Sequence, residues 1–329
     1  MSAIAPTLEA FFTERLMRQR RASHQTIAAY RDGLRLLLGF VKDRSGKAPA
    51  RLEFDDLDAL VIGAFLDHLE HVRGNSVQTR NARLAVIHSF FRFADLRHPE
   101  HANLIARVLA IPPKRFDRTI VSFLSHEETK ALLAATERDC WIGRRDHALL
   151  TVAIQTGLRV SELCGLHCQH VQLGTGANVR CHGKGRRERC TPLTPSTVNT
   201  LHSWMRERAD QPGDALFPTS RGRALSRDAI ALLVTKYATR ARATCPTLQT
   251  KTISPHTLRH TCAMNLLHAG VDVATIALLL GHANLRSVER YIHADMALKE
   301  RALARVAAPG TRPGRYRAPD RLLKFLGSL

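Results

Sequence analysis

The sequence predicts a mainly α-helical protein of two domains, with a small antiparallel β-sheet in the second domain. The chain has 329 residues, enough for two domains of roughly 100–200 residues each. Apolar residues recur three and four positions apart through most of the chain, as on one face of an α-helix. At residues 111–118, two prolines and three basic residues interrupt this pattern, which is typical of a linker.

The first domain is expected at residues 1–110 as a bundle of four or five helices. Pro49, Gly74 and Asn75 lie in the segments between helical stretches and suit turns. Four stretches have helical periodicity: Thr7–Arg20, Gln25–Val41, Leu57–Val72 and Val77–Ala94.

The second domain is expected at residues 119–304, followed by a basic tail at 305–329. Ser125 and Glu128 form a capping-box pattern that predicts a helix to about Thr136. Residues 177–182 and 187–193 flank Gly-Lys-Gly and are expected to form a short hairpin. Further helices are predicted at Asp146–Gln155, Pro195–Ala209, Ser226–Ala241, Pro255–Ala269, Val273–Leu280 and about Ser287–Ala304, with a last amphipathic turn or two at Arg321–Leu326.

The charge balance indicates a polyanionic partner. Forty-nine basic residues against 29 acidic ones give a net charge of +20. Residues 1–110 carry 16 basic and 12 acidic side chains, whereas residues 111–329 carry 33 and 17, so most of the excess lies in the second part. A coding bias toward arginine would explain why only 9 of the 49 are lysine, but it does not explain the shortage of acids. Nucleic acid is the commonest partner of such a chain.

The sequence favours a cytoplasmic, nucleoid-associated protein without a membrane partner. No stretch approaches the ~18 apolar residues that a membrane span needs. The N-terminal residues have acids within their apolar region and no cleavage signal, which is unlike a secretory leader. Seven cysteines, an odd number without framework spacing, fit a reducing compartment.

The first motif is Thr156-Gly-Leu-Arg-Val-Ser-Glu-Leu163. Gly157 can end one helix in the left-handed region, and Arg159 then opens the next. Glu162 lies three residues further on the same face, where it can orient the guanidinium. By itself, this motif is equally consistent with an ordinary Arg–Glu pair on the surface of a helix.

A second motif, Ser254-Pro-His-Thr-Leu-Arg-His260, is expected to start a helix, with Ser254 as N-cap. His256 and Arg259 then share a face at the positive end of that helix, an arrangement suited to binding an anion. The apolar residues Leu258 and Cys262 fall on a separate stripe, so this face is expected to be free.

Three further residues belong to short motifs. Lys184 lies between two glycines at the tip of the predicted hairpin, although a basic turn that only touches phosphates would look the same. Gly281 is expected to end an apolar helix, so that His282 leaves it in a fixed direction. Tyr291 follows on a separate predicted helix, within Arg290-Tyr-Ile-His293.

The chain resembles the tyrosine recombinase, or phage integrase, family in five motifs that occur in order: T-G-L-R-x-S-E-L, G-K-G, H-x-L-R-H, L-G-H and R-Y-x-H. The resemblance covers about residues 119–295. It extends loosely to the N-terminus, where the family has a helical, SAM-like core-binding domain. It implies a two-domain clamp that closes around duplex DNA.

The resemblance also implies a covalent mechanism. Tyr291 would be the nucleophile that attacks a DNA phosphodiester, giving a 3′-phosphotyrosyl link and a free 5′-hydroxyl. A phenol has a pKa near 10 and needs activation, and His256 would act as the base. Lys184 would protonate the departing 5′-oxygen.

The phosphate would be held by side chains instead of a metal ion. Arg159 and Arg259 would clamp its non-bridging oxygens, with His282 as a further donor and Glu162 as a residue behind them that does not touch the phosphate. Two guanidiniums, a lysine, two imidazoles and a phenol without an acidic cluster suit phosphoryl transfer of this kind. No metal, ATP or other cofactor is therefore expected.

The implied partner is double-stranded DNA with inverted-repeat recombination sites, bound by a homo- or hetero-tetramer; accessory proteins are not predicted. The implied role is integration, excision or resolution, most simply of a mobile element. Leu322, Leu323, Phe325 and Leu326 could dock on a neighbouring subunit, and an unstructured basic tail that touches DNA is nearly as good an interpretation.

Several alternatives remain open at this point. A DNA-binding protein without catalysis would need none of these residues to coincide, and a type IB topoisomerase would share the chemistry but relax a single duplex. A zinc site is disfavoured because the spacing lacks a distant second pair; it would use Cys164, His167, Cys168 and His170. The tyrosines disfavoured as nucleophile are Tyr30, Tyr237 and Tyr316.

Overall fold

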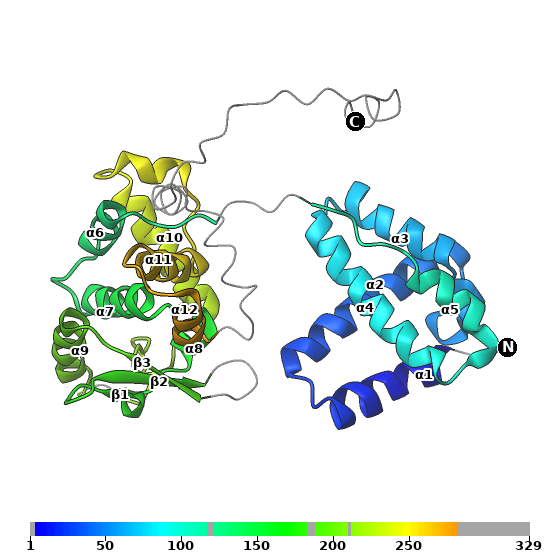
Figure 1. Cartoon of the computed structure of the whole chain (residues 1–329), viewed down its shortest axis with the longest axis horizontal. Coiled ribbons are helices and arrows are strands. Elements are labelled where there is room, and N and C mark those ends of the chain that lie inside the picture. The colour runs from blue at the N-terminus through cyan, green and yellow to red at the C-terminus, as the bar shows by residue number, and fades with distance from the viewer. Residues whose placement is uncertain (1–3, 117–120, 183–187, 210–211, 282–329) are drawn as a thin grey trace, which may run out of the picture. The chain divides into compact units, whose positions relative to one another are not determined.

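The computed structural model describes residues 4–116, 121–182, 188–209 and 212–281. The chain divides into two compact units, Met1–Arg118 and Thr119–Leu329. The described residues are mainly helical, with one three-stranded antiparallel sheet in the second unit (Figure 1). The predicted fold class is therefore confirmed. None of the helices in the described ranges is both long and apolar enough to cross a membrane.

The first unit is a helical bundle around an aromatic core. Phe11, Phe54, Phe65 and Phe90 are almost completely buried there. Ser23, Asp58 and Ser76 accept hydrogen bonds from backbone N–H groups and cap three of its helices. The helices are α1 (Ile4–Ala10), which continues as a π-helical stretch (Phe11–Gln19), α2 (His24–Ser45), α3 (Ala59–His71), α4 (Val77–Asp95) and α5 (Ala102–Leu109).

The residues that follow α5 are fastened to this bundle. The Asn81 side chain on α4 donates to the carbonyl of Lys114 at 2.8 Å and accepts from its N–H at 3.0 Å. The Lys114 ammonium also pairs with Glu70 on α3. The first part of the predicted linker is thus held by the first unit and is less free than two prolines and three basic side chains suggest.

The second unit is built around α7 (Trp141–Thr156), which packs against α9 (Pro195–Arg208) and α11 (Pro255–His268) (Figure 1). Ten of the 16 residues of α7 are buried. The helix begins five residues before its predicted start because the Cys140 thiol accepts a hydrogen bond from the Gly143 N–H and caps it. The other helices are α6 (His126–Ala134), α8 (Val160–Cys164), α10 (Arg227–Ala241) and α12 (Val273–Leu280).

The predicted hairpin is present, and a short third strand extends it. The sheet has the order β1 (Val171–Gln172), β2 (Asn178–His182) and β3 (Glu188–Pro192), with both pairs antiparallel. Cys181 pairs with Arg189 and Val179 with Thr191. Along β3, Arg189 and Thr191 are less exposed than Glu188, Cys190 and Pro192, so the arginine lies on the inner face.

Candidate active site

Three arginines converge on the C-terminal end of α12. Arg259 Nη2 donates to the Leu280 carbonyl at 2.6 Å, Arg159 Nη2 donates to the Gly281 carbonyl at 2.9 Å, and Arg189 Nη1 donates to the Leu279 carbonyl. The last carbonyls of a helix lack intrahelical partners and form the negative end of its dipole. This helix end therefore gathers three guanidiniums from β3, α11 and the start of α8 at one point.

Two glycines make this convergence possible. Gly281 ends α12 in the left-handed region, with φ 63° and ψ 47°. Gly157 ends α7 in the same way, with φ 59°, and its carbonyl accepts from Arg259 Nη1 at 2.6 Å. A Cβ on Gly157 would lie 2.4 Å from Leu280 Cδ2, so any side chain there would push the end of α12 away.

Glu162 lies beneath the arginines and binds two of them. Its Oε1 accepts from Arg159 Nη1 at 2.9 Å, and its Oε2 accepts from Arg189 Nη2 at 2.8 Å and from the Arg159 N–H at 2.7 Å. Burial raises the pKa of Glu162, but the Arg159 N–H and the two guanidiniums outweigh that effect, and the pKa lies below its ordinary value. The buried carboxylate remains charged and fixes both arginines.

His256 and Arg259 lie on the same helix but in different environments. His256 is exposed on the first turn of α11, where Ser254 caps the helix by accepting from the Thr257 N–H. Arg259 is only 4% exposed. The expectation of a free His/Arg face is therefore wrong for Arg259, because its guanidinium bridges the Gly157 and Leu280 carbonyls inside the fold.

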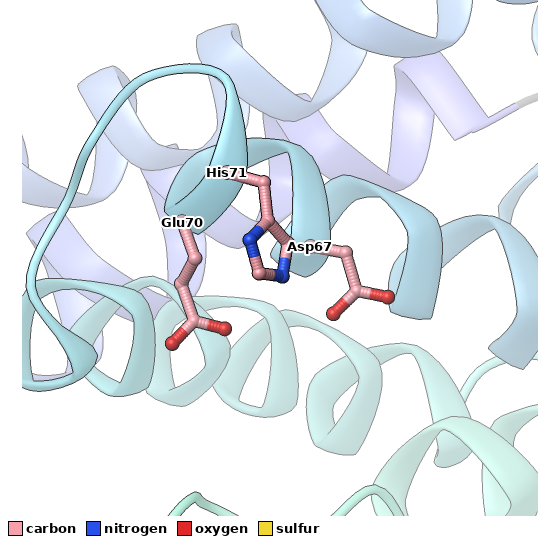
Figure 2. A group of neighbouring side chains, drawn as sticks. All are labelled: Asp67, Glu70 and His71. Atoms are coloured by element: carbon pink, nitrogen blue, oxygen red, sulfur yellow. The ribbon is translucent and has the colours of Figure 1, made fainter.

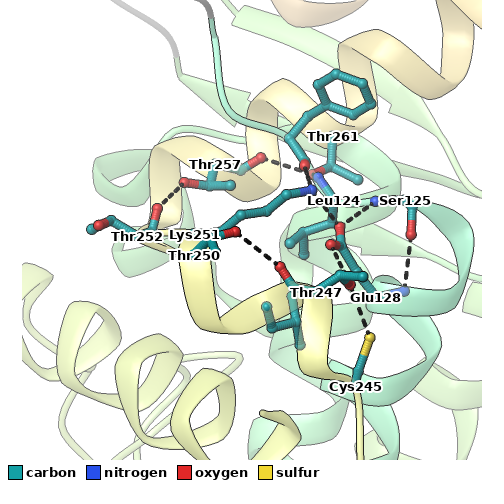
Figure 3. Close-up of polar contacts among 12 residues, drawn as sticks. Leu124, Ser125, Glu128, Cys245, Thr247, Thr250, Lys251, Thr252, Thr257 and Thr261 are labelled. Carbon is teal, nitrogen blue, oxygen red and sulfur yellow. Dashed lines mark hydrogen bonds and ion pairs between the residues drawn. The ribbon is translucent and has the colours of Figure 1, made fainter.

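A polar network anchors the start of α11 to the first residues of the second unit (Figure 3). Lys251 Nζ donates to Glu128 Oε2 at 2.7 Å and to the Phe123 carbonyl at 2.9 Å. The Thr261 hydroxyl on α11 accepts from the Leu124 N–H at 2.9 Å. The helix that carries His256 and Arg259 is thereby fixed to the chain that enters this unit.

Three of the predicted site residues, Lys184, His282 and Tyr291, lie outside the described residues. So do the predicted helix at Ser287–Ala304 and the tail at 305–329. The structure brings together Arg159, Glu162 and Arg259, and it places His256 on α11. The strands on either side of Lys184 in the sequence, β2 and β3, are among the described residues.

Arg189 belongs to this cluster although none of the five sequence motifs contains it. Its side chain is 11% exposed and touches both Glu162 and α12. Strand alternation places Arg189 on the same face as Thr191, but no sequence signal marks that face as the inner one. Nothing in the sequence alone says which partner it meets.

Two of the disfavoured tyrosines belong to cores. Tyr237 is completely buried and donates to Asp146 Oδ2 at 2.9 Å. Burial, followed by the nearby Asp146 charge, raises the pKa of Tyr237 far above its ordinary value. Tyr30 packs against the core of the first unit. Tyr316 lies outside the described residues.

The possible zinc ligands at the end of α8 and just after it, residues 164–170, do not form a group close enough to hold a metal ion among the described residues. Cys164 and Cys168 are half-buried, and His167 Nδ1 lies 2.9 Å from Asp214 Oδ1. In the described chain, one group of potential ligand atoms is close enough to hold a metal ion: Asp67, Glu70 and His71 on α3 (Figure 2). Glu70 already pairs with Lys114 and lies 3.8 Å from Arg80, so its carboxylate has a structural role.

Comparison with known proteins identifies the family. The phage integrase family matches residues 122–297, and the phage integrase N-terminal SAM-like domain matches residues 10–98. The chain belongs to the phage integrase family of tyrosine recombinases. This recombinase is 51% identical over 330 residues to a Sinorhizobium fredii (strain NGR234) protein named as the integrase/recombinase y4rC, covering 100% of this chain and 99% of that one. It is also 33% identical to tyrosine recombinase XerD of Pseudomonas aeruginosa, over 89% of this chain and 94% of the other.

Solved structures confirm the fold of this tyrosine recombinase. XerH site-specific recombinase, bound to its palindromic difH substrate, matches 87% of this chain and 81% of its own, with a TM-score of 0.67 and 22% identity. The Tn1549 transposon integrase, bound to circular-intermediate DNA, matches 93% of this chain and 100% of its own, with a TM-score of 0.70 and 14% identity. The predicted family is confirmed by the family matches and the curated relatives given above.

Proposed function

We propose that this tyrosine recombinase breaks and rejoins duplex DNA at specific sites through a 3′-phosphotyrosyl link to Tyr291. The observation that carries the proposal is the gathering of Arg159 and Arg259 on the carbonyls of Leu280 and Gly281, directly before His282 in the chain. A fixed, partly exposed guanidinium beside a second, buried one suits the recognition of a phosphate.

The two arginines have different tasks in this proposal. The Arg159 side chain is 26% exposed and contacts the scissile phosphate directly. Arg259 is buried and holds Gly157 and α12 in place while it adds positive charge beneath the phosphate. In a water-poor site, such charge stabilises the transition state without a metal ion.

The bond changes balance without ATP or a redox partner. The Tyr291 oxygen attacks phosphorus as His256 takes the phenolic proton, and the phosphorus–O5′ bond breaks as Lys184 gives a proton to the departing 5′-oxygen. His282 donates to the phosphate. Attack by a 5′-hydroxyl of another strand reverses these steps and completes the exchange, because the phosphotyrosyl link retains the energy of the broken phosphodiester.

The proposed partner is double-stranded DNA with inverted-repeat sites. The XerH structure holds a palindromic substrate, and a lambda integrase structure is a tetramer on a Holliday junction. By analogy, we assign DNA binding to the domain at 1–110 and catalysis to the domain at 119–304, connected by the linker at 111–118. We propose that the protein acts as a homo- or hetero-tetramer. The relatives named as integrases favour a mobile element as the target.

The test is to trap the covalent adduct in EDTA on nicked duplexes from the DNA that flanks the gene. Wild type and Tyr237→Phe are expected to form a 3′-linked adduct, whereas Tyr291→Phe forms none. Tyr237→Phe is the matched control because it also removes one phenol, from a buried position. An adduct that persists in Tyr291→Phe would overturn the nucleophile assignment, and an adduct that needs a divalent ion would overturn the metal-free mechanism.

Strand exchange between two such duplexes separates a recombinase from a topoisomerase. We expect recombinant products from two sites. Relaxation of supercoiled DNA without recombinants would favour a type IB topoisomerase. Specific DNA binding without any adduct, over all flanking sites, would favour a binding protein.

A further inference from the structure

We propose that Arg189 is a positioning residue for the recombination site. It holds Arg159, through Glu162, and the end of α12 in the arrangement that receives the scissile phosphate. This inference rests on the proposed function, and it adds a residue that the family motifs selected above do not include.

The contacts of Arg189 join three separate elements. From β3, its Nη2 donates to Glu162 Oε2 on α8 at 2.8 Å, and its Nη1 donates to the Leu279 carbonyl on α12. Glu162 in turn holds Arg159 through its other oxygen at 2.9 Å. One planar guanidinium therefore sets the distance between the Glu162 carboxylate and the end of α12.

Arg189 also packs over the residue that ends α12. Its Cδ and Nε lie 3.0 and 3.1 Å from the position where a Cβ on Gly281 would stand. The missing side chain at Gly281 lets the arginine reach the Leu279 carbonyl. The Gly281 carbonyl, one peptide further on, is the acceptor for Arg159. Movement of Arg189 would therefore disturb the end of α12 and, with it, the Gly281 carbonyl that accepts from Arg159.

The burial of the pair makes this arrangement sensitive to loss of Arg189. The side chains of Glu162 and Arg189 are 3% and 11% exposed, so water is a poor substitute for either partner. Without Arg189, the Leu279 carbonyl loses its side-chain donor, and the Glu162 carboxylate is left with Arg159 as its single guanidinium partner among these contacts. We expect Arg159 to be drawn toward the carboxylate and away from a bound phosphate.

Exposure shows why Arg189 acts through another residue. Arg159 also uses both terminal nitrogens inside the fold, for Glu162 and Gly281, but the Arg189 side chain is only 11% exposed. Arg159, with 26% of its side chain exposed, is the group that can meet the DNA. A lysine could supply the charge of Arg189 but not its fixed, planar pair of donors.

The experiment measures single-turnover adduct formation on the nicked duplex at saturating protein. Arg189→Gln is expected to slow the reaction roughly 10–100-fold, as small displacements of a catalytic group do. Arg189→Lys, which keeps the charge, is expected to stay several-fold below wild type. Arg180→Gln is the matched control, because Arg180 is an exposed arginine on the neighbouring strand of the same sheet.

A double-mutant cycle with Glu162→Gln tests the route of the effect. If Arg189 acts through Glu162, the rate loss of the double variant should be far smaller than the product of the rate losses of the two single variants. Independent, multiplicative losses would overturn the proposed route.

A chemical readout separates positioning from loss of folding. Replacing the scissile phosphate by a neutral methylphosphonate reduces the demand for the guanidinium clamp, so the deficit of Arg189→Gln should shrink on that substrate. A bridging 5′-phosphorothiolate, whose thiolate leaves without a proton, should leave the deficit unchanged. An equal deficit on all three substrates, together with an earlier unfolding transition of the second unit, would overturn the proposal in favour of a merely structural residue. Failure of wild type to form any adduct would instead overturn the proposed function.

Discussion

Arg259 Nη1 donates a 2.6 Å hydrogen bond to the carbonyl of Gly157, although 102 residues separate the two along the chain. Gly157 ends α7 and Arg259 lies on α11, so the bond fixes two helices that pack against each other. The second terminal nitrogen of Arg259 holds Leu280 at the end of α12. One buried guanidinium thus sets the relative positions of three helices around the candidate site.

Gly157→Ala is expected to destabilise the second unit by about 1–3 kcal/mol. The left-handed backbone disfavours any L side chain, and the new methyl group would lie 2.4 Å from Leu280 Cδ2. Denaturant unfolding followed by tryptophan fluorescence measures this directly, because both tryptophans, Trp141 and Trp204, lie in the second unit. Gly174→Ala is the control, since open space surrounds Gly174. Equal midpoints for the two variants would contradict the strain at Gly157.

Glu128→Gln is expected to lower stability at pH 7 by about 1–2 kcal/mol, since it weakens hydrogen bonds to charged and backbone groups. Burial raises the pKa of Glu128, but hydrogen bonds from Lys251, the Ser125 N–H and Thr247 bring the pKa below its ordinary value. A lowered pKa in the folded state contributes stability above the unfolded pKa, and this contribution is lost as pH falls through the folded value.

The difference between wild type and Glu128→Gln should therefore narrow as the pH is lowered from 7 through the lowered pKa of Glu128. Thermal unfolding at a series of pH values provides the measurement. Glu127→Gln is the control, because Glu127 is exposed and contacts Lys130 at the surface. A constant gap across the pH range would show that the carboxylate charge has no part in the anchoring of α11.

Asn81→Ala is expected to make the chain after α5 several-fold more sensitive to trypsin. The Asn81 side chain makes two hydrogen bonds to the backbone of Lys114, beside two consecutive cleavage positions at Lys114 and Arg115. Cleavage requires local opening of the backbone, which these bonds oppose. The rate at which the two units separate on a gel gives the result, with the exposed Asn103→Ala as control. Identical cleavage rates would show that Lys114 is not held by Asn81.

Tyr237→Phe is expected to lower the stability of the second unit by about 1.5–3 kcal/mol, the typical contribution of a hydrogen bond to a charged group. Asp146 keeps its ion pair with Arg145 at 2.6 Å through Oδ1, but its Oδ2 loses the Tyr237 donor. Tryptophan fluorescence again follows the unfolding of this unit. Retained stability would mean that the hydrogen bond from Tyr237 on α10 to Asp146 on α7 contributes little to this unit.

Local sequence signals predicted most of the helices. A capping serine with an acid three residues later, as at Ser125 and Glu128, stabilises a helix start wherever it occurs, and the structure contains that capping box. Gly157 and Gly281 end α7 and α12, as expected, and both residues are in the left-handed region. The start of α7 was missed because its cap is the Cys140 thiol, an unusual acceptor that no common capping pattern includes.

The site was predicted in part. Periodicity placed His256 and Arg259 on one helix, which is correct, but it could not show that Arg259 is buried, since its carbonyl partners come from residues 157 and 280. Arg189 was overlooked for the same reason. A lone arginine in a short strand has no local partner, and its meaning depends on Glu162 and Leu279, which other elements supply.

The fold class, the family and most element boundaries could be predicted from the sequence, because they follow from short-range periodicity, capping and the order of motifs. The way the cluster is held together emerges only when the chain folds: Glu162 binds both Arg159 and Arg189, and three carbonyls at the end of α12 each accept from one arginine. The physical reason is that hydrogen bonds between buried charges depend on three-dimensional separation, and residues far apart in sequence become neighbours only when the helices pack.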